Sequence, residues 1–306
     1  MRNGAYSRVG GTTVEPQVYL NGEFYPQSEA KISVFDHGLL YGDGVFEGIR
    51  AYNKRIFRLK DHVDRIFNSA RSIDLVIPHT REEFTELIKE TCRRNAVDNG
   101  YIRPLVTRGA GDLGLDPRKY KKGASVIIIV ARWDALYESG VYEAGLKLLT
   151  SAIRRVPPQC LSPSIKSMNY LNQILARIQG NLAGMDEVLM LDMQGYVSEA
   201  TADNFFIVKD GRVTTPPTST NLPGITRATV LELCEKLGYP AGERLFTLYE
   251  TYTAEEAFIT GTAAEIGPVV EVDGRKIAEG RPGKITRHLM TAYKELVTST
   301  GDPIYA

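Results

Sequence analysis

The sequence predicts a mixed α/β protein of the α+β class with two domains. The chain has 306 residues, more than one compact core usually holds. Short β-branched segments such as "ASVIIIVARW" alternate with stretches whose apolar residues recur at helical spacing. The composition also shifts at "DALYESGVYEAG". We therefore expect a small N-terminal α/β domain over residues 1–133, an interdomain loop over 134–145 and a large C-terminal domain over 146–306.

The N-terminal part begins with strand and turn signals. "QVYLNGEFYP" predicts a hairpin that turns at Asn21, and "GVFEGIRAYNKRIFRL" predicts two strands around Asn53. Helical spacing in "DHVDRIFNSARSIDL" predicts a helix, and a second helix begins with a capping box from Thr80 to Glu83. "YIRPLVTRG" and "ASVIIIVARW" predict two further strands, and the Gly-rich, charged stretch between them predicts a loop.

The C-terminal part opens with a predicted strand, "LKLLTSAIRR", followed by a Pro-rich turn and Lys166. The helix after this lysine has an apolar side that we expect to be buried: Leu171, Ile174, Leu175, Ile178 and Leu182. Three short strands follow, in "DEVLMLDMQG", "YVSEATADNFFIVKDG" and "RVTTPP". We expect a helix that ends at Gly238, then more strands, and a closing helix in "ITRHLMTAYKELV".

The composition narrows the classes of partner and compartment. Lys plus Arg and Asp plus Glu both total 37, so there is no basic surplus of the kind that nucleic-acid binding needs. No apolar run reaches membrane-spanning length, and the N-terminal residues do not resemble a secretory signal. The three cysteines form no CxxC pair, which argues against a metal site or a disulfide. We expect a cytoplasmic protein that acts on small molecules.

Two Gly-containing turns could bind an anion. "NLPGITRATVLELC" places Gly224, Ile225 and Thr226 at a helix N-terminus, where backbone N–H groups and a hydroxyl suit a phosphate. "ITGTAAEIGP" places Gly261 and Thr262 in a small-residue turn that lets backbone approach a ligand. Taken singly, an ordinary helix cap at Thr226 and a turn without a ligand are the simpler interpretations.

Three charged residues complete a possible cofactor site. Arg58 lies at a strand-to-helix junction, and its guanidinium suits a phosphate, although a surface arginine is the simpler interpretation. Glu199 lies on a strand pattern; if buried, it needs a cationic or protonated partner such as a pyridine nitrogen. Lys166 lies before an apolar helix. Pyridoxal 5'-phosphate requires a lysine for its Schiff base, an acidic partner and a phosphate cradle, so together these residues favour that cofactor.

The chain also resembles the fold-type IV pyridoxal-phosphate enzymes, which have the D-amino acid aminotransferase-like fold, and among them the branched-chain amino acid aminotransferases. The similarity extends from about residue 17 to about residue 290. The matching stretches keep their order and spacing: "DHGLLYGDGVFEGIRAY", "IFRLKDHVDRI", "YIRPL", "LGLDP", "SIKSMNYLNQILA", "GYVSEATADNFFIVKDG", "LPGITR" and "FITGTAAEI".

The resemblance implies a role for each matched cofactor residue. Lys166 is the expected Schiff-base lysine, Tyr170 a hydrogen-bond partner of the phenolic oxygen, and Glu199 the partner of the pyridine nitrogen. The phosphate is expected to contact Arg58, Gly224, Ile225, Thr226, Gly261 and Thr262. By the same resemblance, the reaction moves the amino group of L-leucine, L-isoleucine or L-valine to 2-oxoglutarate by a ping-pong mechanism, as in branched-chain amino acid biosynthesis.

The resemblance implies substrate contacts as well. Tyr101 is expected to bind the α-carboxylate, with help from backbone amides at Thr262 and Ala263, and Arg103 to bind the side-chain carboxylate of glutamate. The side-chain pocket is expected to be formed by Phe46, Tyr41, Trp133 and Ala264. Leu113 and Tyr41 are expected to complete the site of a neighbouring subunit, which implies a homodimer or a higher homo-oligomer.

Alternatives remain within the same fold. A D-amino acid aminotransferase typically has an Arg-x-His pair on the strand "VTRG", and none of the four histidines lies there. An aminodeoxychorismate lyase shares the cofactor cradle, but "FEGIR" and "YIRPL" favour the aminotransferase. A non-catalytic cofactor-binding protein would lack the lysine or the glutamate. We assign no histidine to chemistry, although His37 could support a subunit interface. Leu136 stands where some members of the family have a tyrosine, so the sequence leaves open whether aromatic substrates are also accepted.

Overall fold

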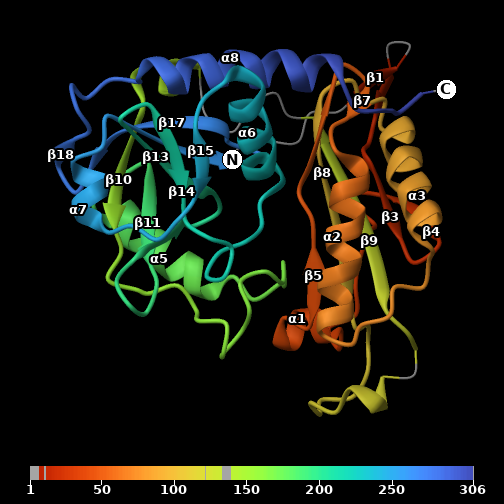
Figure 1. Cartoon of the computed structure of the whole chain (residues 1–306). Helices are drawn as coiled ribbons and strands as arrows, with labels where there is room; N and C mark the ends of the chain where they lie inside the picture. The colour runs from red at the N-terminus through yellow and green to blue at the C-terminus, as the bar shows by residue number, and fades with distance from the viewer. Residues whose placement is uncertain (1–6, 10–11, 121, 133–138, 306) are drawn as a thin grey trace. The chain divides into compact units, whose positions relative to one another are not determined.

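The computed structural model describes residues 7–9, 12–120, 122–132 and 139–305, and its described part forms two compact units (Figure 1). The N-terminal unit contains the described residues up to 132, together with Ile165–Asn169 and the described residues from Val297 onward. The C-terminal unit contains the described residues 139–164 and Tyr170–Leu296. The two short segments in the N-terminal unit, one of which carries Lys166, fall within the predicted C-terminal range. Trp133 and Leu136 lie outside the described residues.

Strands and two long helices make up the N-terminal unit. Its strands are β1 (Ser7–Val9), β2 (Thr12–Val14), β3 (Gln17–Leu20), β4 (Glu23–Pro26), β5 (Gly44–Phe46), β6 (Ile49–Tyr52), β7 (Arg55–Ile56), β8 (Gly100–Thr107), β9 (Ser125–Arg132) and β19 (Asp302–Pro303). Its helices are α1 (His37–Tyr41), α2 (Leu59–Ser72), α3 (Arg81–Arg94) and the 3-10 turn η1 (Pro117–Lys119). These positions confirm the hairpin at Asn21 and the two predicted helices.

One sheet organises this unit. Its strand order is β19-β7-β6-β8-β9-β3-β4, and β5 pairs with β8. Helices α2 and α3 pack on each other and on this sheet (Figure 1). Ile49, Ile102, Ile128 and Phe84 are fully buried in the core between them. The sheet thus holds β5 and β8 side by side, with Phe46 opposite Leu105.

The C-terminal unit is a second mixed layer of strands and helices. Its strands are β10 (Leu146–Thr150), β11 (Glu187–Leu191), β12 (Val197–Ala200), β13 (Asn204–Lys209), β14 (Arg212–Thr215), β15 (Ala241–Glu243), β16 (Glu256–Gly261), β17 (Glu265–Val272) and β18 (Arg275–Lys276). Its helices are α4 (Ser139–Ala144), α5 (Leu171–Leu182), α6 (Ile225–Leu237) and α7 (Leu248–Tyr252). Helix α8 (Lys284–Ser299) begins in this unit and ends in residues grouped with the other.

The sheet of this unit has the order β12-β11-β10-β17-β16-β13-β14-β15, with β18 paired to β17. Helix α5 packs on β11, and α6 packs on β15 and β16. Phe205, Phe246 and Ile259 are fully buried in the core. Helix α6 ends as predicted at Gly238, whose φ of 76° is the left-handed conformation that glycine adopts readily.

The apolar side of α5 differs from the prediction. Leu171 is 65 % exposed and Leu182 is 86 % exposed, and the three apolar residues between them are exposed as well. The helix instead buries Gln173, Ala176 and Gly180 against the sheet. A Cβ at position 180 would lie 2.3 Å from Val188, so a small residue is required at this contact. The prediction of a buried apolar side was wrong for the single chain, because the sheet packs on the small-residue side.

Candidate functional site

Strands β5 and β8 place three predicted substrate residues together on the N-terminal unit. Tyr101 and Arg103 are two positions apart on β8, so their side chains leave the same face of the sheet. Arg103 Nη2 donates to Tyr101 Oη over 2.8 Å, and its guanidinium lies 4.8 Å from the centre of the Phe46 ring. Gly48 makes room for this arrangement, since a Cβ there would lie 2.0 Å from Tyr101 Oη.

Lys166 belongs to the same face. Its carbonyl oxygen accepts from Phe46 N over 3.0 Å, and its own N–H donates to Ser69 Oγ over 3.2 Å. Val45 and Ser167 also form an isolated antiparallel bridge. These contacts hold the lysine Nζ 4.7 Å from the centre of the Phe46 ring. The predicted lysine therefore lies next to Phe46, and its backbone is fixed by contacts with β5 and α2.

A buried ion cluster, Glu47–His62–Arg65, lies next to Phe46 in the sequence. Glu47 is fully buried and accepts from His62 Nδ1 over 2.7 Å and from Arg65 Nε over 2.6 Å. Burial alone would raise the pKa of Glu47, but the charge of Arg65 and the hydrogen bonds from Arg65 and His62 outweigh it and lower that pKa well below its usual range. Burial lowers the pKa of His62, and the charges of Arg65 and Lys166 add to this effect against the opposing pull of Glu47. Glu47 is therefore ionised and His62 neutral at neutral pH.

Arg58 lies where the sequence predicted, between β7 and α2. It forms the N-cap of α2 in the left-handed conformation, with a φ of 52°. Its Nη1 lies 3.3 Å from Asp61 Oδ2, and its carbonyl oxygen accepts from His62 N over 3.2 Å. The helix start thus ties the predicted phosphate ligand to the Glu47–His62–Arg65 cluster through the backbone.

Tyr41 and Leu113 contact each other on the N-terminal unit. Tyr41 Oη donates to the carbonyl oxygen of Leu113 over 2.7 Å, and this links α1 to the loop between β8 and β9. The Leu113 side chain is 62 % exposed. Trp133, the remaining predicted aromatic wall, lies outside the described residues.

Glu199 is the central acidic group of the C-terminal unit. It lies on β12 and is buried, which excludes the interpretation as an exposed strand end. Its Oε1 accepts from Arg155 Nε over 2.6 Å, and its Oε2 accepts from Leu222 N over 3.1 Å. Asn204 Nδ2 also donates to Oε2 over 3.4 Å. The carboxylate therefore has a buried cationic partner, and the sequence did not predict either Arg155 or Asn204 as part of the site.

The two predicted anion-binding turns meet the turn between β12 and β13. A Cβ at Gly224 would lie 2.0 Å from Asn204 Oδ1, and a Cβ at Gly261 would lie 1.8 Å from Asp203 Oδ1. Gly224 is the N-cap of α6, so Thr226 is not the cap, and among the described residues no side chain caps this helix end. The N–H groups of Ile225 and Thr226 belong to the first helical turn, where the helix provides no acceptor.

The other predicted residues of this unit surround the same strands. Thr262, Ala263 and Ala264 form the turn between β16 and β17, and the carbonyl oxygen of Ala264 accepts from Tyr142 Oη over 3.2 Å. Tyr170 forms the N-cap of α5. The C-terminal unit therefore brings together the carboxylate, the uncapped N-terminus of α6 and the small-residue turn.

The donor set of these residues suits a phosphorylated pyridine cofactor. An uncapped helix N-terminus attracts a phosphate dianion through its N–H groups and its dipole. A buried carboxylate that already has an arginine partner can remain ionised and face a protonated ring nitrogen. By contrast, a cavity of about 450 Å³ beside β3 and β9 contains none of the predicted site residues.

Comparison with known proteins places the chain in a family. Residues 44–272 match the class IV amino-transferases. The chain is a class IV aminotransferase. The match spans both units and includes all the predicted cofactor residues from Arg58 to Thr262.

Three relatives of this class IV aminotransferase are similar to it over nearly the whole of both chains. The branched-chain-amino-acid aminotransferase of Pseudomonas aeruginosa is 41 % identical, with 92 % of each chain covered. The crystal structure of the branched-chain amino acid aminotransferase of Escherichia coli has a TM-score of 0.91 at 34 % identity, covering 95 % of this chain and 100 % of that one. The branched-chain amino acid aminotransferase of Thermobaculum terrenum, solved in its PLP-form (holo-form), has a TM-score of 0.83 at 32 % identity, covering 93 % and 94 %.

The mixed α/β fold that the sequence predicted for this aminotransferase agrees with the fold of these enzymes. In the described part of the chain, no helix combines the length and the apolar character that crossing a membrane requires.

Proposed function

We propose that this aminotransferase transfers the amino group of L-leucine, L-isoleucine and L-valine to 2-oxoglutarate by a ping-pong mechanism that uses pyridoxal 5'-phosphate. The observation that carries the proposal is the position of the Lys166 amine by the ring of Phe46, which the guanidinium of Arg103 also contacts while it donates to Tyr101. Close similarity to enzymes named branched-chain aminotransferases supports the substrate class.

The cofactor would be held by the residues that the sequence predicted. The carboxylate of Glu199 would face the ring nitrogen, and Tyr170 would contact the ring's phenolic oxygen. The phosphate would be bound by Arg58, the α6 residues Gly224, Ile225 and Thr226, and the turn residues Gly261 and Thr262. When bound, pyridoxal 5'-phosphate supplies an electron-accepting ring that stabilises negative charge at the substrate Cα. The Thermobaculum terrenum relative was solved in its PLP-form, which supports this assignment.

Lys166 would provide the base of the reaction. Its amine lies over an aromatic ring in a partly buried position. Once it is released, the amine can accept the proton from the substrate Cα. The contacts with Phe46 N and Ser69 Oγ fix the lysine backbone. Only the side chain would therefore move when the lysine changes from binding the cofactor to accepting the proton.

One pocket must accept both apolar and acidic side chains. Phe46 supplies an apolar ring, and the guanidinium of Arg103 lies over that ring while it donates to Tyr101. Arg103 would bind the side-chain carboxylate of glutamate, and Tyr101 and the amides of Thr262 and Ala263 would bind the α-carboxylate. When leucine is bound, Arg103 would keep its contacts with Tyr101 and Phe46, so its charge would not be buried without a partner. Tyr41, Trp133 and Ala264 would complete the apolar wall.

A homodimer or a higher homo-oligomer is part of the proposal. Exposed apolar side chains gather on α5, from Leu171 to Leu182, and on two loops of the N-terminal unit, including Val34, Leu113 and Leu115. Contiguous exposed apolar surface usually marks a contact with another chain. Leu113 would then enter the neighbouring subunit's site.

A cytoplasmic location is also proposed. Among the described residues, Cys92, Cys160 and Cys234 are free thiols. Burial raises the pKa of Cys92 to about 12 and that of Cys234 to about 11, so both thiols stay protonated. Free, unreactive thiols suit a reducing compartment.

The test uses the purified protein with added pyridoxal 5'-phosphate. Its visible absorbance is recorded while L-leucine, and separately D-alanine, is added without an acceptor. Loss of the band with L-leucine alone is the expected result, and transfer to 2-oxoglutarate then yields glutamate. Lys166→Ala should abolish the transfer, whereas the surface variant Lys147→Ala should retain it. Full transfer by Lys166→Ala would refute the mechanism. A response to D-alanine alone would favour a D-amino acid aminotransferase, and no response to either would favour the lyase.

A further inference from the structure

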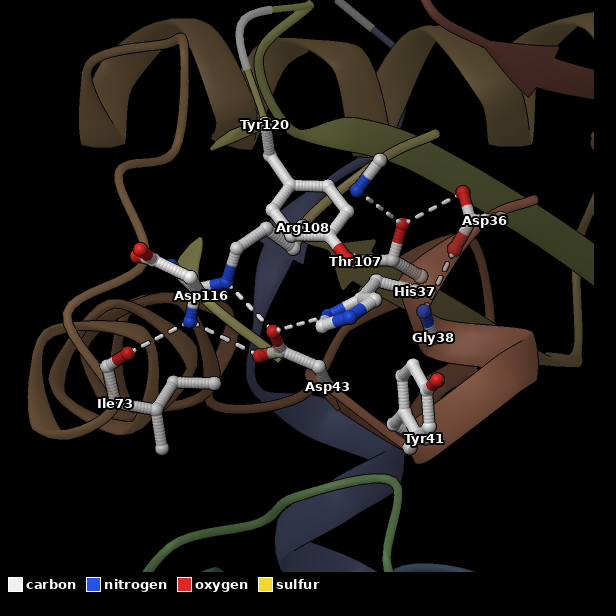
Figure 2. Close-up of polar contacts among 12 residues, drawn as sticks. Asp36, His37, Gly38, Tyr41, Asp43, Ile73, Thr107, Arg108, Asp116 and Tyr120 are labelled. Atoms are coloured by element: carbon white, nitrogen blue, oxygen red, sulfur yellow. Dashed lines mark hydrogen bonds and ion pairs between the residues drawn. The ribbon is translucent and has the colours of Figure 1, made fainter. Parts of the chain in front are cut away.

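His37 is a buried histidine that the proposed reaction does not use (Figure 2). It is the first residue of α1, and its Nδ1 lies 2.8 Å from Asp43 Oδ2. Its Nε2 lies 3.1 Å from the carbonyl oxygen of Gly114, in the loop between β8 and β9. Each ring nitrogen therefore faces an oxygen atom.

Both of these oxygens accept hydrogen bonds. A carbonyl oxygen has no proton to donate, and an ionised carboxylate also only accepts. A neutral imidazole has one donor nitrogen and one acceptor nitrogen, so it can satisfy only one of the two partners. We propose that His37 carries a proton on both ring nitrogens, and that this imidazolium positions the loop that presents Leu113.

The charge of Asp43 supports the proposal. Arg108 Nε lies 2.6 Å from Asp43 Oδ2, and Arg108 Nη2 lies 2.9 Å from Asp43 Oδ1. The guanidinium therefore binds the carboxylate in a bidentate manner (Figure 2). Burial alone would raise the pKa of Asp43, but the hydrogen bonds of Arg108 and His37 outweigh it and lower that pKa. Asp43 is therefore an anion at neutral pH and cannot donate a proton to Nδ1.

Arg108 is fixed by the chain itself. It also donates to the carbonyl oxygens of Ile73 and Asp74, each over 2.8 Å, just beyond the end of α2. The arginine cannot turn away without leaving these acceptors unpaired. The carboxylate that faces His37 is thus held in place from the opposite side.

Three consecutive loop carbonyls lie within hydrogen-bond distance of side-chain donors of this cluster, and the single hydroxyl hydrogen of Tyr120 is shared between two of them. Tyr120 Oη lies 3.1 Å from the carbonyl oxygen of Asp112 and 2.6 Å from that of Gly114. Tyr41 Oη donates to the carbonyl oxygen of Leu113, and His37 Nε2 is the second donor to Gly114. The backbone carbonyls face the cluster, whereas the side chains of Leu113 and Leu115 are exposed.

Two aromatic rings pack against His37. The ring of Tyr41 lies 4.7 Å away at an angle of 71°, and the ring of Tyr120 lies 4.1 Å away. Burial raises the pKa of Tyr120, with Asp112 adding to it, so this phenol remains a neutral donor.

The other charged groups of the region are paired elsewhere. Asp36 accepts from Gly38 N and from Thr107 Oγ1. In the loop, Asp112 pairs with Lys119 and Asp116 pairs with Arg118. The groups that respond to the charge of His37 are therefore Asp43 directly and Arg108 through it.

The consequence is a loop whose anchoring depends on pH. The hydrogen bond from Nε2 to Gly114 needs the second proton, so the anchoring is complete on the acidic side and is lost as the pH rises. A charge-assisted bond is typically worth more than a neutral one, so we expect on the order of tenfold more opening of the loop when it is lost. Only the role of Leu113 in a neighbouring site rests on the proposed function; the protonation state does not.

The first test is nitrogen NMR of the full chain with labelled histidine. The His37 signal is assigned by elimination with the variants His62→Gln, His79→Gln and His288→Gln. At about pH 7, both ring nitrogens of His37 should resonate as protonated, whereas His62 should show one unprotonated nitrogen. An unprotonated ring nitrogen in His37 at this pH would overturn the proposal. This measurement needs no variant of His37 and no catalysis.

The second test is hydrogen exchange of residues 109–119, corrected for the intrinsic rate and followed from about pH 5 to about pH 9. The wild type should lose protection on the alkaline side. His37→Gln should have low protection that is independent of pH, because the glutamine amide does not titrate and has one donor atom in place of the two ring nitrogens that face Asp43 and Gly114. Tyr41→Phe is the matched control: it removes the donor to Leu113 only, so protection should fall at every pH while its pH dependence remains. A His37→Gln profile with wild-type pH dependence would refute the inference.

Discussion

Replacing Glu47 by glutamine removes the negative charge at the centre of the Glu47–His62–Arg65 cluster. In the wild type, Oε1 accepts from Arg65 Nε, and Oε2 accepts from His62 Nδ1 and from Arg65 Nη2. Oε2 also lies 3.2 Å from Gly48 N. An amide has only one oxygen, so whichever way it is oriented its NH₂ group faces at least one donor. Arg65 then keeps a charge without its counter-ion.

The expected loss follows from burial. Glu47 is 0 % exposed and the Arg65 side chain is 11 % exposed, so water can compensate for little of the missing charge. Removing one partner of a buried ion pair costs about 3–5 kcal/mol, and we expect about 3 kcal/mol because Arg65 is not fully buried. At about 2–4 °C per kcal/mol, the unfolding temperature should fall by roughly 6–12 °C.

Urea and thermal unfolding at neutral pH measure this loss. Glu90→Gln is the matched control, since Glu90 pairs with Arg93 and Arg94 on the same helix and is partly exposed. Exposed pairs of this kind contribute about 0.2–1 kcal/mol, so the control should unfold close to the wild type. If the two variants unfold alike, within about 1 kcal/mol, the cluster does not stabilise the fold as argued.

Three further predictions follow from local contacts. Gly48→Ala should raise the KM for the amino acid, because its Cβ would lie 2.0 Å from Tyr101 Oη; steady-state kinetics with an unchanged KM would contradict this. Burial lowers the pKa of His62, so its share of stability is present above about pH 6.5 and lost as the pH falls below it. His62→Asn should therefore lose less unfolding free energy on acidification than the wild type, and equal losses would refute the assignment. Thr80→Ala should lower the free energy of unfolding in urea by about 1 kcal/mol and leave kcat unchanged. A variant as stable as the wild type would show that the cap is dispensable.

Signals that act within a few residues predicted the structure well. The hairpin turn at Asn21 has the positive φ that its Asn-Gly sequence favours. The capping box from Thr80 to Glu83 is formed by both of its hydrogen bonds, and α6 ends at Gly238. Such features depend on backbone conformation and neighbouring donors, which the sequence gives directly.

Partners far apart in the chain were not predicted. Arg155 lies 44 residues before Glu199 in the sequence. Its own surroundings in the sequence predicted only the end of a strand. His62 read as a residue near a helix start, yet the pairing of strands buries it against Glu47. The prediction that the apolar side of α5 is buried was wrong for a related reason. Periodicity identifies which side of a helix is apolar but not which surface covers that side. Contacts of this kind depend on the sheet register, which single motifs do not encode.

The N-terminal unit includes two pieces of chain that are synthesised late. Ile165–Asn169 supplies the bridge from Ser167 to Val45, and β19 pairs with β7 close to the fully buried Ile304. A ribosome that has produced only the first 132 residues has therefore not yet made a whole unit. Its sheet gains its last strand only after the entire C-terminal unit has been translated. Each of the two units is made of separate stretches of chain, so neither corresponds to one uninterrupted length of polypeptide.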